Sequence, residues 1–164
     1  MRHLFVFGAI KTGAVLAGAI TWSLFHSAIN PYTLSQPSSF AHVVLQRDGH
    51  NVDYFFPALG SFVTSVSVSG VHGRRLGDEA AYLRSRGGHH VHRSGWIRVA
   101  RRLYPLLRAD FYGLVGHWQI DMVSFRERGR IWQLTASYDV HYRSMRSVML
   151  RMLNSFRFRE AGTT

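Results

Sequence analysis

The sequence has 164 residues, a formal net charge of +11 and no cysteine. This length suffices for one domain with a single core, and the lack of cysteine excludes disulfides, thiolate metal sites and cysteine nucleophiles. The positive charge favours an acidic protein, lipid headgroups or nucleic acid as the partner, although a basic protein without such a partner would have the same composition.

The first 29 residues are predicted to form a transmembrane anchor. Thr12 to Ile29 contains no charged residue, and the helix extended back to Leu4 is long enough to cross the apolar core of a bilayer. Basic residues precede this run, and none follows before Arg47. This asymmetry predicts an inner or energy-transducing membrane location, with a cytoplasmic amino terminus and a periplasmic or otherwise extracytoplasmic domain. A cleaved secretory signal, which has the same basic start and apolar run, is the alternative.

Small residues about four apart in this segment would let a neighbouring membrane helix pack closely. They are Gly8, Thr12, Gly13, Ala14, Ala17 and Gly18. The ordinary alanine and glycine content of a membrane helix explains the same pattern equally well.

The remaining chain divides into three parts. Asn30 to Ser39 has two prolines and no periodicity, which predicts an extended linker over 30–39. Residues 40–159 are predicted to form one α+β domain, and 160–164 a tail.

Strands are expected at the start of this domain. Phe40 to Gln46 and Asn51 to Phe56 are rich in β-formers on either side of Asp48-Gly49, which predicts a tight hairpin. Ser61 to Ser69 alternates polar and apolar residues, as a half-buried strand does. Asp78 to Ser85 is predicted to be a short helix that ends at Gly87-Gly88.

Three imidazoles follow this helix, at His89, His90 and His92. They are weak candidates for a zinc, nickel or copper site, because such a site needs a further ligand and a rigid support. The glycines on both sides predict a mobile, solvated loop instead, so no metal and no cofactor is assigned.

The second half of the domain reads as long strands and a closing helix. Trp96 to Leu103 is an imperfectly alternating run, and Val115 to Arg126 pairs with Ile131 to Tyr138 across Glu127–Arg130 in the clearest predicted hairpin. Asp139 is predicted to cap a helix over Val140 to Asn154. The apolar residues of this helix recur on one face and are predicted to be buried in the core: Met145, Val148, Met149, Met152 and Leu153. Ser155 to Arg159 is expected to be a last short strand.

Arginine clusters are the candidate partner-binding residues. Arg126, Arg128 and Arg130 lie around the tip of the long predicted hairpin, and Arg101 and Arg102 are adjacent to each other. Forked guanidinium groups suit carboxylates and phosphates. We expect these five residues to meet an anionic protein or lipid surface.

The chain resembles the PsbP-like fold family, which includes extrinsic photosystem subunits and small bacterial envelope lipoproteins. The resemblance rests on the glycine turn and aromatic strand Gly129–Leu134, the amphipathic closing helix, and its exit through Asn154–Arg157. It implies an antiparallel sheet with packed helices and a role in binding and assembly rather than catalysis. The anchor, the short linker and the positive charge predict docking on an integral membrane protein complex, and the resemblance suggests a photosynthetic or electron-transfer complex as the example. The first predicted hairpin lacks the proline followed by tryptophan that is usual in the family. The net charge of +9 after Gln46 is also unusual for the family.

Other functions are less consistent with the sequence. A secretion-system assembly factor would have a long helix directly after the anchor, and Asn30 to Gln46 contains none. An envelope protein that binds an anionic partner is the further alternative. Neither a hydrolase nor a P-loop motif occurs, so the chain is predicted not to be an enzyme. Nucleic-acid binding is disfavoured because no recognised reading motif accompanies the arginines.

Overall fold

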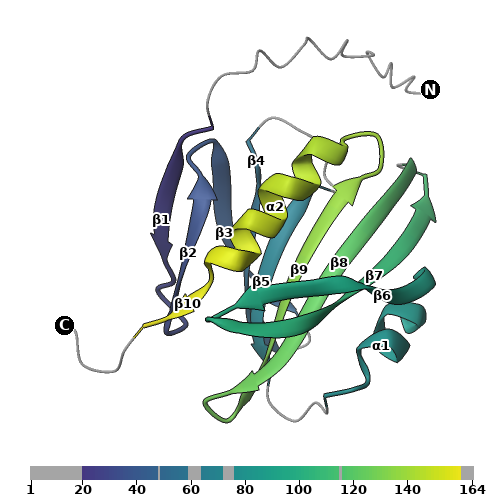
Figure 1. Ribbon diagram of the computed structural model, residues 1–164. Coiled ribbons are helices and arrows are strands. Elements are labelled where there is room, and N and C mark those ends of the chain that lie inside the picture. Colours follow the sequence, from purple (N-terminus) through teal and green to yellow (C-terminus); the bar gives the residue numbers. More distant parts are fainter. Residues whose placement is uncertain (1–19, 48, 59–63, 72–75, 115, 160–164) are drawn as a thin grey trace, which may run out of the picture.

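The computed structural model describes residues 20–47, 49–58, 64–71, 76–114 and 116–159. In this part of the chain two helices accompany two antiparallel sheets (Figure 1). The smaller sheet has the order β1-β2-β10, formed by β1 (Trp22–His26), β2 (Tyr32–Pro37) and β10 (Arg157–Phe158). The larger sheet has the order β3-β4-β5-β9-β8-β7-β6. Its strands are β3 (Phe40–Arg47), β4 (His50–Pro57), β5 (Ser65–Val71), β6 (His89–Val99), β7 (Arg102–Gly113), β8 (Gly116–Glu127) and β9 (Arg130–Asp139).

The prediction of a transmembrane helix up to Ile29 is wrong. Trp22–His26 is strand β1, hydrogen-bonded to β2 with Phe25 opposite Leu34. No helix in the described ranges is long and apolar enough to cross a membrane. The predicted membrane location, with a cytoplasmic amino terminus and an external domain, depended on that helix and is wrong with it. Gly8, Thr12, Gly13, Ala14, Ala17 and Gly18 lie outside the described residues.

The linker prediction fails for a related reason. Within Asn30 to Ser39 the chain forms β2, whose Tyr32 and Leu34 are fully buried. Both belong to the main core cluster, and Trp22 and Phe25 of β1 pack against it. The folded unit therefore includes residues well before Phe40. An apolar aromatic run suits a membrane helix and a strand alike, and here pairing with β2 decides between them.

The two predicted hairpins are present. Strands β3 and β4 pair from Phe40↔Pro57 to Arg47↔His50, and β8 and β9 pair from Trp118↔Asp139 to Glu127↔Arg130. The second turn consists of Arg128 and Gly129, with φ of 53° and 73°. Two consecutive positive φ values are typical of a type I′ turn, which matches the twist of the flanking strands. Glycine takes this conformation without strain.

Three local predictions need correction. The histidine segment is the start of β6 rather than a loop. Trp96 to Leu103 is divided by a turn at Ala100 and Arg101, with φ of 47° and 69°, so that β7 returns alongside β6. Asp139 does not cap α2 (Arg143–Ser155); its carboxylate accepts a hydrogen bond from the backbone N–H of His141.

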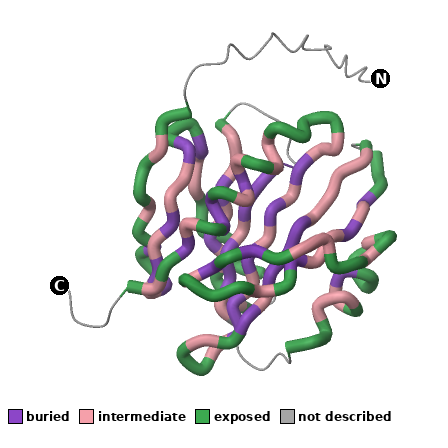
Figure 2. The backbone as a smooth tube through the Cα atoms, viewed as in Figure 1, coloured by how far each residue is buried: buried purple, intermediate pink, exposed green. Residues whose placement is uncertain are grey.

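One face of the large sheet packs against α2. On β9 the side chains of Trp132, Leu134, Ala136 and Tyr138 alternate toward this helix and are at most 1% exposed. Met149, Met152 and Leu153 of α2 meet them, as the predicted stripe required. Figure 1 shows α2 lying across the sheet, and Figure 2 shows the buried stretches along its central strands. We call this side the α2 face.

The opposite face is covered only in part, by the short helix α1 (Glu79–Ser85). Leu83 of α1 forms a second, smaller core cluster with Ala109, Phe111 and Met122. Gly88 lets this helix approach the sheet, because a Cβ there would lie 2.7 Å from the Leu83 carbonyl oxygen and 3.1 Å from the Phe111 ring. We call this side the α1 face.

Candidate functional site

The structure separates the three arginines predicted at the hairpin tip. Arg126 pairs with Ile131, whereas Arg130 pairs with Glu127, so Arg126 lies on the α1 face and Arg130 on the α2 face. The Arg128 guanidinium donates a hydrogen bond to the Arg159 carbonyl at 2.8 Å and lies 5.1 Å from the centre of the Phe158 ring. The three side chains therefore do not form one surface.

Arg101 lies in the β6–β7 turn and Arg102 is the first residue of β7, and both are exposed. The Arg102 Nη1 atom is 3.5 Å from Glu127 Oε2, so the turn reaches the end of β8. Arg102 and Arg126 also line the same groove. Of the five predicted residues, the structure brings these two together.

This hairpin groove, as we call it, is a hollow of about 660 Å³ on the α1 face. It lies between the start of α1 and strands β7 and β8. Apolar side chains dominate its lining, with Leu103 59% and Leu76 44% exposed. Large aliphatic side chains exposed together beside arginines are typical of surfaces that other proteins cover.

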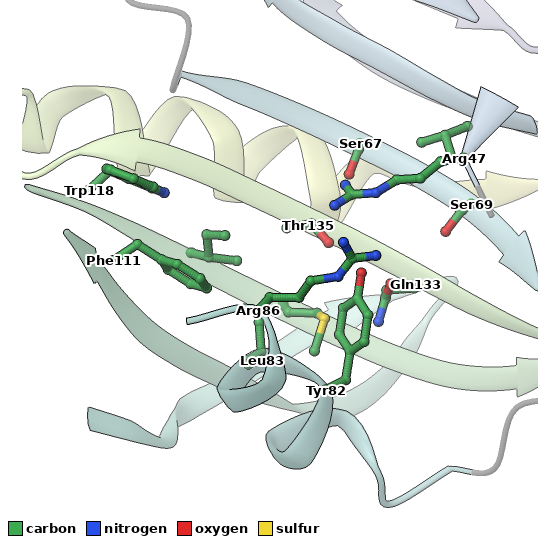
Figure 3. Close-up of a pocket in the computed structure, with 13 residues that line it drawn as sticks. Arg47, Ser67, Ser69, Tyr82, Leu83, Arg86, Phe111, Trp118, Gln133 and Thr135 are labelled. Atoms are coloured by element: carbon green, nitrogen blue, oxygen red, sulfur yellow. The ribbon is translucent and has the colours of Figure 1, made fainter. Parts of the chain in front are cut away.

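A second hollow of about 360 Å³ lies on the other side of α1, and we call it the α1 pocket. The two ends of this pocket have different side chains, as Figure 3 shows. At one end the guanidinium groups of Arg47 and Arg86 point toward short polar side chains of the sheet, and at the other lie the rings of Phe111 and Trp118. The full lining is Arg47, Val52, Ser67, Ser69, Tyr82, Leu83, Arg86, Phe111, Trp118, Ile120, Met122, Gln133 and Thr135.

Strand alternation and register build the sheet wall of this pocket. Ser67 is opposite Thr135, and Ser69 is opposite Gln133, so these four polar side chains form a compact block on the α1 face. Helix α1 and its C-terminal cap residue Arg86 supply the other wall, and the Arg86 guanidinium lies 5.5 Å from the centre of the Tyr82 ring. The hydroxyl of Tyr82 points toward the same polar end (Figure 3).

Among the described residues, the lining of this pocket contains two arginines and no carboxylate. Within the part of the chain that the structure describes, no carboxylate pairs with Arg47.

The two fully buried carboxylates of the described residues lie on the other side of the sheet. Asp121 is fully buried and accepts hydrogen bonds from Arg108 Nε at 2.9 Å, Arg146 Nε at 2.9 Å and Tyr138 Oη at 3.0 Å. Burial, with the nearby Asp121 carboxylate, raises the pKa of Tyr138 to about 12. This network therefore fixes a neutral phenol beside a paired carboxylate on the α2 face.

Asp53 forms a similar buried network. Its carboxylate accepts hydrogen bonds from Ser27 Oγ at 2.8 Å and Tyr32 Oη at 2.6 Å, and His42 Nε2 lies 2.8 Å from its other oxygen. Burial, followed by the bond to Asp53, raises the pKa of Tyr32 far above its ordinary value. These bonds attach β1 and β2 to the large sheet.

The predicted histidine candidates do not converge. His90 Nδ1 lies 3.2 Å from Asp110, His92 Nδ1 lies 2.6 Å from the His90 carbonyl oxygen, and His89 packs on the Tyr112 ring. Among the described residues no group of three or more histidines and acids could hold a metal ion. The backbone is irregular at this point, with a register shift between His89 and His92 and a φ of 48° at His90.

The Asp110 carboxylate is within hydrogen-bond distance of the side chains of His90, His117 and Gln119. Burial acts to raise its pKa, but hydrogen bonds from Gln119, His117 and His90 outweigh burial and hold that pKa below its ordinary value.

Sequence reasoning missed the α1 pocket. The alternating serines of β5 were recognised as one face of a strand, but not as part of a site. The one available signal was the spacing of Tyr82 and Arg86 in a predicted helix. It says nothing about which strand the helix faces, and Arg47 comes from a distant hairpin.

Comparisons with known proteins bear on the fold. No protein-family model matches the chain, and no curated protein matches its sequence. A crystal structure of a protein from Bacteroides thetaiotaomicron VPI-5482 is similar, with a TM-score of 0.55 and 8% identity over 81% of this chain. This chain spans about half of that protein, 47% of its length.

The solution structure of cyanobacterial PsbP from Synechocystis sp. PCC 6803 is also similar. The TM-score is 0.53 with 15% identity, and the match covers 92% of this chain and 98% of that one. The likeness therefore extends over nearly the whole of both chains, while identity this low is evidence for the fold alone. The chain has the PsbP-like fold that its closing hairpin and helix indicated.

Proposed function

We propose that this protein is a non-catalytic accessory protein that docks on an acidic surface of a larger protein complex through the hairpin groove. A photosynthetic or electron-transfer complex is the example that the PsbP-like fold suggests. The observation that carries the proposal is the groove itself, in which exposed apolar side chains lie beside Arg102 and Arg126.

The distribution of charge supports an acidic partner. Thirteen of the sixteen arginines in the described ranges are exposed, whereas only one of the seven described acidic residues, Asp78, is. Folding turns Asp53 and Asp121 inward and leaves their negative charge unavailable at the surface. The protein therefore presents a more uniformly positive surface than its composition implies, which steers it toward negative surfaces.

The apolar lining supports a protein partner rather than a free anion. Trp96, 60% exposed, is on the adjoining strand β6 opposite Pro105 of the groove, and Leu103 is similarly exposed. Aromatic, aliphatic and arginine side chains together are the composition of interface centres. The fitting occupant is a segment that inserts an apolar side chain and carries acidic residues beside it.

Association in gently prepared extracts at low salt tests this proposal. The intact protein should comigrate with a large complex. Arg102→Gln and Arg126→Gln should each weaken association about five-fold, from ~1 kcal/mol per exposed charge pair. The weakening should diminish as salt is added, because exposed charges are screened. Arg130→Gln is the matched control, since that residue is close in sequence to Arg126 but is not among the described residues that line the groove.

Photo-crosslinking distinguishes docking from non-specific charge attraction. A photoreactive residue replacing Leu103 should label an acidic segment of one partner. The same replacement at Val44, 45% exposed at the opposite edge of the sheet, should not. Migration as a free monomer at low salt, or equal labelling from both positions, would contradict the proposal.

A further inference from the structure

The hairpin groove lies where the seven-stranded sheet splits. Strands β7 and β8 pair from Gly113↔Gly116 to Leu107↔Met122, and no further pair joins these two strands, although both continue toward their tips. Beyond that point β7 stays paired with β6, and β8 stays paired with β9. Figure 1 shows the tips of the two hairpins apart. The groove therefore has the edge of a strand on each side.

Pro105 explains where the pairing of β7 with β8 stops. The next pair in this register would join Pro105 to Ser124. The two-residue turn between β6 and β7 makes Val99 and Arg102 a hydrogen-bonded pair, so by alternation the backbone of Pro105 faces β8 rather than β6. Proline has no N–H group to donate across this gap, so the ladder ends one pair earlier.

The edge of β8 in the groove carries backbone groups that do not bond to β9. The two-residue turn at the end of β8 makes Glu127 and Arg130 a hydrogen-bonded pair. By alternation Phe125 also bonds to β9, whereas Ser124 and Arg126 turn their N–H and C=O groups away from β9, toward β7. The hydroxyl of Ser124 is buried and has no hydrogen-bond partner among the described residues. Buried polar groups normally have partners, so this edge favours a further strand.

The split is closed on three sides and open to the α1 face. The rings of Tyr104 and Phe125 stack across it, 4.8 Å apart at 27°, and pack against the core of the α2 face. Arg102 and Glu127 lie 3.5 Å apart across its tip. From Met122 to Glu127 strand β8 advances roughly 16 Å, at about 3.3 Å per residue. The hollow of about 660 Å³ therefore has the length of a short extended segment.

We propose that the partner adds an extended acidic segment to the β8 edge in the hairpin groove, which rests on the docking proposed above and specifies its form. The backbone of the segment bonds to Ser124 and Arg126, and alternate side chains face apolar groups such as Leu103. Its acidic side chains lie beside Arg126, which is exposed and pairs with no carboxylate among the described residues.

Hydrogen exchange of the intact, unbound protein tests whether the edge is open. The amide hydrogens of Ser124 and Arg126 should exchange at least about ten-fold faster than that of Phe125, which is bonded to β9. Protection equal to that of Phe125 would show that the edge is already occupied and would overturn the proposal.

A defined peptide tests strand addition directly. Acetyl-Glu-Val-Glu-Val-Glu-amide should slow the exchange of the Ser124 and Arg126 amides and shift their NMR signals. Two N-methylated versions, one at the valines and one at the glutamates, keep every side chain and each remove the donors of one strand edge. One version should bind at least about ten-fold more weakly than the other, because only one edge faces β8. Absence of binding, or equal binding of both versions, would overturn the proposal.

A proline variant tests strand addition in the association with the large complex. Ser124→Pro removes the N–H that faces the groove and keeps the bonds to β9, so it should weaken association at least about ten-fold. Ser124→Ala, which removes only the hydroxyl, should weaken it less. Val44→Pro is the matched control, since it places proline at an exposed position of β3, the opposite edge of the sheet. Circular dichroism checks that each variant folds.

These measurements separate strand addition from the docking on which it rests. Comigration of the wild-type protein that Ser124→Pro leaves unchanged would overturn strand addition and leave docking intact. Migration of the wild-type protein as a free monomer would contradict docking, and the peptide measurements then decide strand addition by themselves. The same measurements on the wild-type protein decide it if Ser124→Pro does not fold.

Discussion

The two faces of the seven-stranded sheet are built from the same strands and have opposite characters. On β9, the side chains of Trp132, Leu134, Ala136 and Tyr138 face α2 and are essentially inaccessible. Their neighbours Gln133, Thr135 and Ser137 face the other way and remain half-buried. One face is a closed aromatic core, and the other holds two hollows.

The covering helices explain this difference. Helix α2 has thirteen residues and is roughly 20 Å long, whereas α1 has seven and is roughly 10 Å long. The shorter helix covers only part of the sheet, and the hairpin groove and the α1 pocket lie on its two sides. The fold thus places its stability mainly on the α2 face and its candidate binding surfaces on the α1 face.

The largest effect is expected from breaking the α2 face at Asp121. Asp121→Ala leaves Arg108, Arg146 and Tyr138 without their shared acceptor, so the free energy of unfolding should fall by about 3–5 kcal/mol. Urea unfolding followed by circular dichroism measures it. Asp139→Ala is the control, since that carboxylate accepts a local backbone bond, and it should cost less than about 1.5 kcal/mol. Equal losses would show that the buried network is not a main source of stability.

A smaller and more local effect is expected at Gly88. Gly88→Ala would place a methyl group 2.7 Å from the Leu83 carbonyl oxygen, so α1 must shift, at a cost of about 1–3 kcal/mol. Hydrogen exchange should then accelerate in α1 while the amides of α2 keep their protection, because the two helices pack on different core clusters. Loss of protection in both helices together would show that the two faces unfold as one unit.

The smallest effect is expected for the stability that Asp110 contributes and that is lost at low pH. Its folded pKa is lowered, so the stability it contributes is present above its unfolded pKa, about 3.9, and is lost as the pH falls through the folded value. Gln119→Leu removes one donor to its carboxylate and should move the pKa of Asp110 upward. Carboxyl-carbon NMR titration measures this pKa directly. Gln133→Leu, which changes the same residue type on the α1 face, should leave it unchanged.

Local sequence pattern was sufficient for the hairpins and for the closing helix. Alternation and the Gly129 turn predicted β8 and β9, and the apolar stripe of α2 predicted which residues would be buried. These elements depend on contacts between residues close in the chain, so nearby sequence carries most of the information. The PsbP-like fold was recognised from this same region.

The site depended on contacts between distant segments, which local pattern does not contain. The run from Thr12 to Ile29 had the composition of a membrane helix, but its described part contains β1, an edge strand that pairs with β2 and packs Trp22 and Phe25 against the core. The arginine-rich hairpin tip was found, but strand register put Arg126 and Arg130 on opposite faces. Composition and periodicity by themselves determined a basic, strand-rich protein with an α2 core. Only the tertiary structure decided that Arg47 and Arg86, 39 positions apart, meet at one pocket, because that meeting depends on the order of strands in the sheet and on the face that α1 covers.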